Sequence, residues 1–296
     1  MQSGAIRPLN NMLPRNLFNT EHEAFRETVR KFYAKEVVPN IEKYEQQQHV
    51  DRELWNKAGT MGLLCATMPE AYGGSGVDRL YSMILIEEQA YAMDSSTGFS
   101  LHSDIVANYI NNFGNEAQKH YWLTRMASGE TVTAIAMTEP GTGSDLQAVR
   151  TTAVLDGDDY IINGSKIFIT NGYLCDMAVV VCKTGDTDKG SANLSLIIVE
   201  ADRVGFSKGK PLNKIGMKGQ DTCELFFDHV RVPKENLLGM EGMGFMMLMK
   251  ELAWERMLVA IICQAGAEAA LAHTVQYTKE RKAFGKTVSR DRKSVV

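Results

Sequence analysis

The spacing of apolar residues divides the chain into three successive regions. From about residue 20 to 130, apolar positions recur with helical spacing, as in TEHEAFRETVRKF, where Val29 and Phe32 fall on one stripe. At the start of this segment, Thr20 and Glu23 have the spacing of a capping box. The segments LYSMILIEEQAYAM and NEAQKHYWLTRMASG predict further helices. The first region is therefore predicted to be helical.

From about residue 131 to 232, the pattern becomes typical of strands. The runs MAVVVCK, LSLIIVE and CELFFDHVRV are rich in β-branched or aromatic residues and are bounded by Gly, Asp or Pro. Within DGDDYIINGSKIFITNG, Asn163 and Gly164 are typical of a hairpin turn between two short strands. No helical pattern separates the runs, which favours an antiparallel sheet or small barrel over a parallel sheet.

After Gly239 the spacing is helical again, and the segment GFMMLMKELAWERMLVAIICQAGAEAALAHTVQYTKER predicts one or two long helices. The predicted fold is multi-domain α+β. It has an N-terminal helical domain over residues 1–130, a middle antiparallel β domain over 131–236, and the start of a C-terminal helical bundle over 237–290. A helical domain ending soon after RKAFGKTVS would leave its apolar stripes without partners. We therefore expect this domain to be incomplete here and residues 291–296 to be a non-native tail.

Composition narrows the class of protein. The 296 residues are 44% hydrophobic and 23% charged, which is ordinary for globular proteins with a sizeable core. A net charge of −4 argues against a nucleic-acid-binding protein. The five cysteines are scattered and form no C-x-x-C pair, which indicates a reduced, intracellular protein without a zinc site. The longest apolar run, residues 257–263, is far shorter than the roughly 20 residues of a membrane span, so no span is predicted.

A glycine-rich turn, AIAMTEPGTGSDLQAV, lies at the predicted boundary between the helical and β regions. Another segment, FGKT, is not a P-loop, because Glu280 stands at the position of the leading glycine. The turn itself is not a dinucleotide fingerprint, because Leu146 stands where the third glycine belongs. Its glycines permit close backbone approach, and Thr138 and Ser144 offer hydroxyls. The turn is either a plain connector or one wall of a ligand site at the domain boundary, with FITNG adding an aromatic face.

Glu255 falls on an apolar stripe of the last predicted helix. The other members of the stripe are Leu248, Leu252, Val259 and Ile262. A carboxylate in this setting is desolvated, which raises its pKa and suits it to proton abstraction near neutrality. The alternative is a surface glutamate beside Arg256, an interpretation that also fits Lys250 and Glu251. The pattern leaves both interpretations open.

Several motifs together resemble the acyl-CoA dehydrogenases. AMTEPGTGSDLQA resembles the first signature of that family, and NGSKIFITNG, GMKGQDTCELFFDHVRVP and YTKERKAFGKTV resemble later blocks in the same order and spacing. The resemblance runs from about Leu17 to Ser289 and is strongest to the long-chain branch, from EHEAFRETVRKF through KELAWERMLVA. The family fold, a helical domain, a β domain and a four-helix domain, has the order that the apolar pattern predicts.

The resemblance implies noncovalent FAD between the β domain and the helices. The residues that it places along FAD are Ile135, Met137, Thr138, Gly143, Ser144, Phe168, Ile169, Thr170 and Arg281. Thr138 would lie at the polar edge of the flavin, and Phe168 to Thr170 would flank its ring. Arg281 would contact the phosphates of FAD in a neighbouring subunit through charge-assisted hydrogen bonds.

The resemblance also implies the reaction. Glu255 would take the α-proton of an acyl-CoA and the β-hydride would pass to FAD, which leaves a trans-2-enoyl-CoA. The residues implied to contact the substrate are Ser144, Ser191, Ala192, Met246, Ala253, Trp254 and Arg256. We expect medium-to-long straight chains in fatty-acid β-oxidation. The alternatives are a branched-chain, isovaleryl-type dehydrogenase, an acyl-CoA oxidase and an inactive fragment.

The same resemblance implies partners and a compartment. Electrons would pass to electron-transfer flavoprotein, and the complete protein would be a homotetramer, a dimer of dimers. We expect a bacterial-type cytoplasm, with the mitochondrial matrix as the alternative, and no metal, nucleic acid or membrane span.

Overall fold

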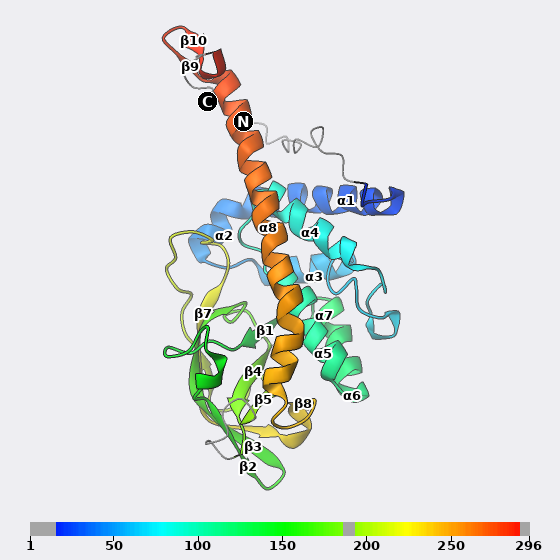
Figure 1. Cartoon of the computed structure of the whole chain (residues 1–296), viewed down its shortest axis with the longest axis vertical. Helices are drawn as coiled ribbons and strands as arrows, with labels where there is room; N and C mark the ends of the chain where they lie inside the picture. Colours follow the sequence, from blue (N-terminus) through cyan, green and yellow to red (C-terminus); the bar gives the residue numbers. More distant parts are fainter. Residues whose placement is uncertain (1–15, 186–192, 291–296) are drawn as a thin grey trace.

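The computed structural model describes residues 16–185 and 193–290, so the predicted tail at 291–296 lies outside the described residues. Three groups of elements follow one another along the chain: N-terminal helices, a β-sheet, and one long helix that runs past both (Figure 1).

The N-terminal region is a set of short helices around a buried aromatic core. Its helices are α1 (Thr20–Phe32), α2 (Ile41–Gln47), α3 (Arg52–Thr60), α4 (Arg79–Tyr91), α5 (Ala107–Phe113), α6 (Glu116–Gln118) and α7 (Thr124–Ala127). Between them lie the π-helical stretches η1 (Tyr33–Val37), η4 (Leu101–Val106) and η5 (Lys119–Leu123), and the 3₁₀ turns η2 (Val38–Asn40) and η3 (Glu70–Tyr72). The predicted capping box was wrong by one position, because Asn19 caps α1 and pairs reciprocally with His22.

The middle region is a single mixed sheet. Its strands are β1 (Thr133–Ala136), β2 (Thr152–Asp156), β3 (Asp159–Thr170), β4 (Met177–Lys183), β5 (Leu194–Glu200), β6 (Phe206–Lys208), β7 (Thr222–Pro233) and β8 (Leu237–Leu238), with 3₁₀ turns η6 (Leu146–Ala148) and η8 (Lys234–Asn236). The order is β6-β7-β3-β2-β4-β5-β8, with β1 added beside β4. Most pairs are antiparallel as predicted, but β4 pairs in parallel with β1 and meets β2 in parallel at one position.

The predicted hairpin at Asn163 and Gly164 is wrong. These residues lie inside the continuous strand β3, and the turn between β2 and β3 is made at Gly157, where φ is +64°. Asn163 accepts a hydrogen bond from the backbone N–H of His229, and the pairing of β3 with β7 shifts register here. A Cβ on Gly164 would lie 2.5 Å from Thr151 Oγ1. The Asn-Gly pair therefore marks a β-bulge where two backbone segments approach closely.

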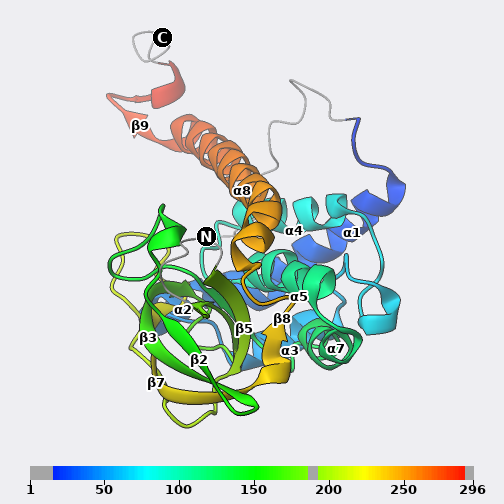
Figure 2. The same ribbon diagram turned by 60° about the horizontal axis from the view of Figure 1, so that its bottom comes forward.

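The third region is the single helix α8 (Gly244–Glu280), followed by a small hairpin of β9 (Lys282–Ala283) and β10 (Lys286–Thr287) and a 3₁₀ turn, η9 (Val288–Arg290). Helix α8 packs against β5, α5 and α4 as far as Ala269, which is buried beside Tyr91 of α4, and its last turns extend away from the rest of the molecule (Figures 1 and 2). Large apolar side chains remain exposed along it, namely Met246, Met249, Met257, Val259, Leu271 and Tyr277.

Helix α8 also has the length and apolar composition of a membrane-crossing helix, the one such helix among residues 16–185 and 193–290. The longest unbroken apolar run, from which no span was predicted, did not reveal this property of α8, and the prediction of no span stays a prediction. The run is short because single charged residues interrupt a helix that is apolar on average.

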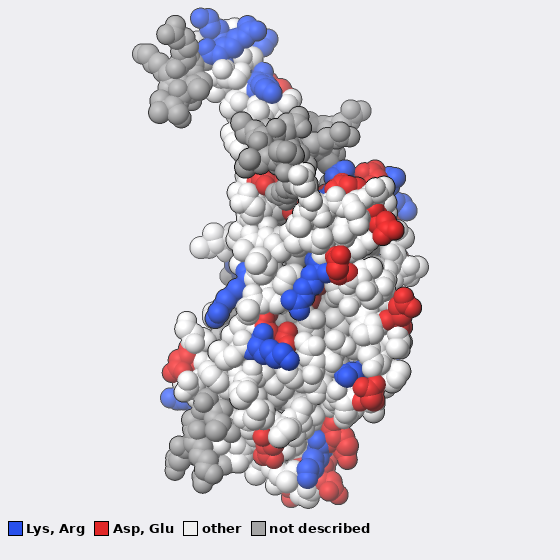
Figure 3. Space-filling view, turned by 45° about the vertical axis from the view of Figure 1, so that its right-hand side comes forward, with Lys and Arg blue, Asp and Glu red and all other residues white. Residues whose placement is uncertain are grey.

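Charged side chains of both signs are interspersed over the face shown in Figure 3. Basic residues gather at the tip beyond the body of the molecule, and those of the described chain are Lys279, Arg281, Lys282, Lys286 and Arg290.

Candidate active site

The loop that follows β1 is fixed by a buried ion pair. Glu139 accepts hydrogen bonds from Lys166 Nζ at 2.9 Å, from the Thr151 hydroxyl at 2.6 Å and from the backbone of Arg150 and Thr151. Lys166 is fully buried and also donates to the carbonyl of Met137. Burial would raise the pKa of Glu139, but Lys166 and Thr151 outweigh it and hold that pKa below its usual value. Because buried charges persist only when paired and hydrogen-bonded, this pair anchors the loop to β3.

The tip of the loop is open on its outer side. A Cβ on Gly141 or Gly143 would meet no atom within 4 Å, and neither residue has a positive φ. Within the part of the chain that the structure describes, neither packing nor backbone conformation therefore requires glycine at these positions. Ser144 is exposed beside them, and Thr138 is half-buried. An open glycine backbone with flanking hydroxyls allows a ligand to approach the main chain closely.

The end of β3 lies against this loop and turns an aromatic ring outward. The backbone N–H of Ile167 donates to the carbonyl of Thr138 at 3.0 Å. The next residue, Phe168, sits at a register shift of the sheet with φ of +60°, and its side chain is 63% exposed. A positive φ is unfavourable for a bulky residue, and such strain clusters at functional sites. Ile169 points into the core of the β domain, so it can offer only its backbone to a ligand, whereas Thr170 is half-buried.

Glu255 is half-buried on α8 and is held by one hydroxyl. Tyr109 of α5, itself fully buried, donates its hydroxyl proton to Glu255 Oε1 at 2.8 Å. Burial raises the pKa of Glu255, the Tyr109 hydrogen bond opposes that rise, and the neighbouring Glu251 adds to it. The net result is a carboxyl group with a pKa above its ordinary value, as proton abstraction near neutrality requires.

The apolar face of α8 is rotated from the predicted stripe. The buried residues in the first part of α8 are Gly244, Met247, Leu248, Glu251, Leu258, Ile261 and Ala265. Val259, predicted on the stripe, is 60% exposed, and Glu255 lies at the edge of the packed face. The surface interpretation of Glu251 was wrong: it is 5% exposed and accepts a hydrogen bond from Asn112 Nδ2 at 2.9 Å.

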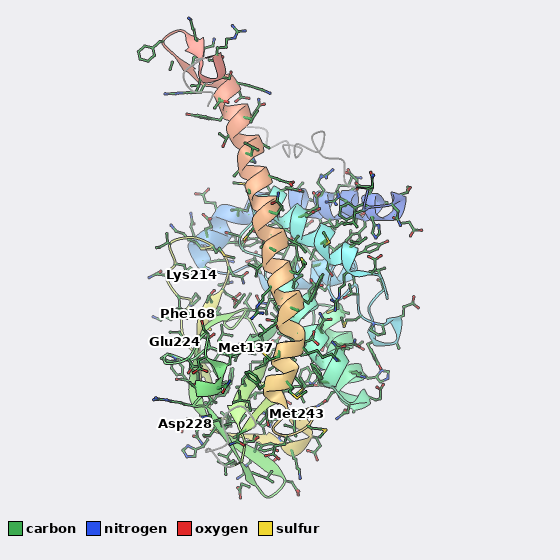
Figure 4. All side chains as sticks on the ribbon, in the orientation of Figure 1. Met137, Phe168, Lys214, Glu224, Asp228 and Met243 are labelled. Carbon is green, nitrogen blue, oxygen red and sulfur yellow. The ribbon has the colours of Figure 1, made fainter. Side chains whose placement is uncertain are left out.

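One hydrophobic cluster joins the loop after β1 to α5, which carries Tyr109, and to α8, which carries Glu255. Tyr109 and Ile135 are buried members of this cluster, and Met137 and Met243 pack against it. Figure 4 places Met137 beside α8 and Phe168 farther out on the β domain. The cluster thus joins the end of β1 to α5 and the first part of α8, and the Ile167–Thr138 hydrogen bond ties the end of β3 to the loop after β1.

Other predicted substrate residues do not converge with Glu255. At 3.6 residues per turn, Met246 and Ala253 project from the side of α8 opposite Glu255, and both are exposed. Arg256 is exposed as well. Trp254 is partly buried, with the guanidinium of Arg79 4.4 Å from its ring centroid.

Of the three remaining predicted residues, one lies far from the loop and two lie outside the described residues. Arg281 follows the last turn of α8, at the tip that projects from the body (Figure 1). Ser191 and Ala192 lie outside the described residues.

Comparison with known families settles the assignment. Three models match in order: the acyl-CoA dehydrogenase N-terminal domain over residues 19–130, the middle domain over 134–230 and the C-terminal domain over 242–293. The chain belongs to the acyl-CoA dehydrogenase family. This acyl-CoA dehydrogenase is therefore an FAD-dependent oxidoreductase, and the predictions of family, fold class and cofactor are confirmed.

Individual relatives agree. The chain is 49% identical to the mitochondrial long-chain specific acyl-CoA dehydrogenase of Sus scrofa, over 98% of this chain and 67% of that protein. An acyl-CoA dehydrogenase structure from Geobacillus kaustophilus is 47% identical with a TM-score of 0.90, covering 93% of this chain and 73% of that one. One complexed with FAD, from Bacillus anthracis, is 33% identical with a TM-score of 0.86, covering 96% and 48%. Relatives thus include mitochondrial and bacterial enzymes.

The family assignment also accounts for the apolar surface of α8. The segment that matches the C-terminal domain model includes the whole helix. Length and composition alone do not distinguish a membrane-spanning helix from a helix that packs in a helical domain. The match to the C-terminal domain favours the second explanation for the apolar composition of α8.

The described residues of this acyl-CoA dehydrogenase fit FAD. The open backbone at Gly143 and the hydroxyls of Thr138 and Ser144 can bind polar groups of the cofactor, and the outward ring of Phe168 offers an aromatic face. Sequence reasoning had missed the residues that hold these groups in place, Glu139 and Lys166, although both lie inside the quoted motifs.

Proposed function

We propose that this acyl-CoA dehydrogenase oxidises an acyl-CoA thioester to the trans-2-enoyl-CoA with Glu255 as the catalytic base. The supporting observation is the half-buried carboxylate of Glu255, whose pKa is raised by burial and whose Oε1 is engaged by the Tyr109 hydroxyl. We assign the α-proton to Oε2, the oxygen to which Tyr109 does not donate. Bound FAD supplies the acceptor for the hydride that leaves the β-carbon.

The remaining residues bind and orient. Thr138, Gly143 and Ser144 would bind FAD along the loop after β1, which the Glu139–Lys166 pair keeps rigid. Phe168 and Thr170 would flank the flavin, with the backbone of Ile169 between them. Trp254 and Arg256 adjoin Glu255 along α8 but project from other sides of the helix, so their contact with the substrate is proposed from the family resemblance alone. Met246 and Ala253 project from the side of α8 opposite Glu255, so they would contact only a part of the substrate that lies on that side.

The substrate class that we propose is a medium-to-long straight acyl chain, because the relative from Sus scrofa is named as long-chain specific and is 49% identical. Electron-transfer flavoprotein would be the acceptor. A homo-oligomer is proposed because α8 carries Arg281 away from its own chain's loop, which leaves it available to FAD of a second copy.

The deciding experiment compares Glu255→Gln with a matched variant. In the FAD-loaded enzyme, Glu255→Gln is expected to keep its flavin but to show no loss of flavin absorbance on anaerobic addition of acyl-CoA. The control is Glu268→Gln, because Glu268 is also a half-buried glutamate of α8 that accepts a tyrosine hydroxyl, from Tyr91 at 2.7 Å. The control is expected to be reduced at the wild-type rate. Rapid reduction of Glu255→Gln would remove Glu255 from its role.

The same titration tests the substrate class. Straight acyl-CoAs of graded length are compared with isovaleryl-CoA, and the rate of flavin reduction is measured for each. Fastest reduction by a long straight chain supports the proposal. Fastest reduction by isovaleryl-CoA would assign the enzyme to the branched-chain class instead.

A further inference from the structure

Two hydrogen bonds connect α5 to α8 in register. Tyr109 and Asn112 lie one turn apart on α5, and their partners Glu255 and Glu251 lie one turn apart on α8. The donor–acceptor distances are 2.8 Å for Tyr109–Glu255 and 2.9 Å for Asn112–Glu251. Each helix thus contributes two side chains of one kind, neutral donors from α5 and carboxylates from α8.

Tyr109 is a rigid donor. Its side chain is fully buried in the hydrophobic cluster that also contains Ile135 and Leu248, so its ring cannot change position without disturbing the core. The π-helical stretch η4 runs directly into α5 and determines which α5 side chains face α8. A buried tyrosine hydroxyl needs a polar partner, and Glu255 is that partner.

This inference rests on the proposed role of Glu255 as the base. We propose that Tyr109 is a positioning residue that holds Oε1 of Glu255 so that Oε2 faces the substrate. Glu251, which is fixed by Asn112 one helical turn away, acts on the charge of Glu255 in the opposite direction to Tyr109. Tyr109 favours the carboxylate form of Glu255, whereas Glu251 favours the protonated form.

The other charged groups around Glu255 are accounted for. Arg256, on α8 itself, favours the carboxylate form but is exposed to solvent. Asp104 of η4 accepts a hydrogen bond from Ser82, and Arg79 of α4 lies over the ring of Trp254. Within residues 16–185 and 193–290, Tyr109 and Glu251 are therefore the two buried groups that act on Glu255 directly.

The test is the acid limb of kcat/KM against pH, which reports the pKa of the base in the free enzyme. Removing the hydroxyl in Tyr109→Phe withdraws a hydrogen bond from the carboxylate, so the limb is expected to move to higher pH by about one unit. Below the limb this corresponds to about a tenfold loss of kcat/KM. Removing the charge in Glu251→Gln is expected to move the limb to lower pH by about one unit.

The controls separate positioning from general damage. Tyr91→Phe removes the matched hydroxyl of the Tyr91–Glu268 pair and is expected to leave the limb in place. An unmoved limb in a folded, flavin-loaded Tyr109→Phe enzyme would overturn the proposal. If that variant does not fold, Glu251→Gln decides: a downward move supports the proposal, and no move or an upward move overturns it.

Failure of the proposed function is a distinct outcome. If Glu255→Gln is still reduced rapidly by acyl-CoA, Glu255 is not the base, whatever Tyr109→Phe does. If Glu255→Gln is inactive and neither Tyr109→Phe nor Glu251→Gln moves the acid limb, Glu255 remains the catalytic base. Only the proposed effect of Tyr109 and Glu251 on Glu255 is then wrong.

Discussion

At the scale of single residues, the ion pair of Lys166 with Glu139 is the most demanding contact near the site. Lys166→Met would leave a buried carboxylate without its partner, which typically costs about 3–5 kcal/mol of folding free energy. We expect urea denaturation to show that loss, and we expect the double variant Lys166→Met/Glu139→Gln to recover part of it, because the unpaired charge is gone. A single variant as stable as the wild type would contradict the expectation.

The pH dependence of stability tests the same pair. The pKa of Glu139 is lowered on folding from an ordinary value of 4.5, so the folded state binds protons less readily than the unfolded state. Its contribution is therefore fully present well above pH 4.5 and is lost as the pH falls through the lower, folded pKa. Wild-type stability is expected to fall more steeply below pH 4.5 than that of Glu139→Gln, as measured by denaturation at fixed pH values.

At the scale of secondary-structure elements, two glycines of neighbouring segments have opposite requirements. Gly164 in β3 has φ of +152° and no room for a Cβ beside Thr151, whereas Gly143 has a negative φ and open space. Gly164→Ala is therefore expected to lower the free energy of unfolding by more than about 1 kcal/mol. Gly143→Ala is expected to leave it unchanged and to reduce the FAD content of the purified protein. Equal thermal stability of the two variants would show that the bulge does not need glycine.

The elements also show what the sequence could and could not predict. Long periodic segments, such as those that became α4 and α8, and the β-branched runs of β4 and β5 were identifiable because their pattern is local. The Asn-Gly bulge was mistaken for a turn, because the close approach of Thr151 that requires Gly164 comes from another segment, just before β2. Local periodicity likewise cannot fix the rotation of α8, which its packing on α4 and α5 determines. For the same reason the burial of Glu251 and the partner of Glu255 were missed: Tyr109 is far away along the chain.

At the scale of the whole molecule, α8 separates two groups that one reaction would need. Glu255 lies in the packed half of the helix, and Arg281 lies beyond its far end, at the basic tip (Figures 1 and 3). If Arg281 binds FAD of a second copy, each site is built from two chains. Arg281→Ala alone is expected to lower FAD content and activity, and Glu255→Gln alone to abolish activity while keeping FAD.

Hybrid enzymes made from these two variants distinguish the arrangements. In a dimer of one Arg281→Ala chain and one Glu255→Gln chain, an exchanged Arg281 gives one site with both groups intact and one site with neither. Co-expression with two different affinity tags, followed by tandem purification, is therefore expected to recover acyl-CoA-dependent flavin reduction that neither parent shows at that level. If Arg281 instead served its own chain, every site in the hybrid would lack one of the two groups. The hybrid would then be no more active than the average of its parents, because no site would contain both Glu255 and Arg281.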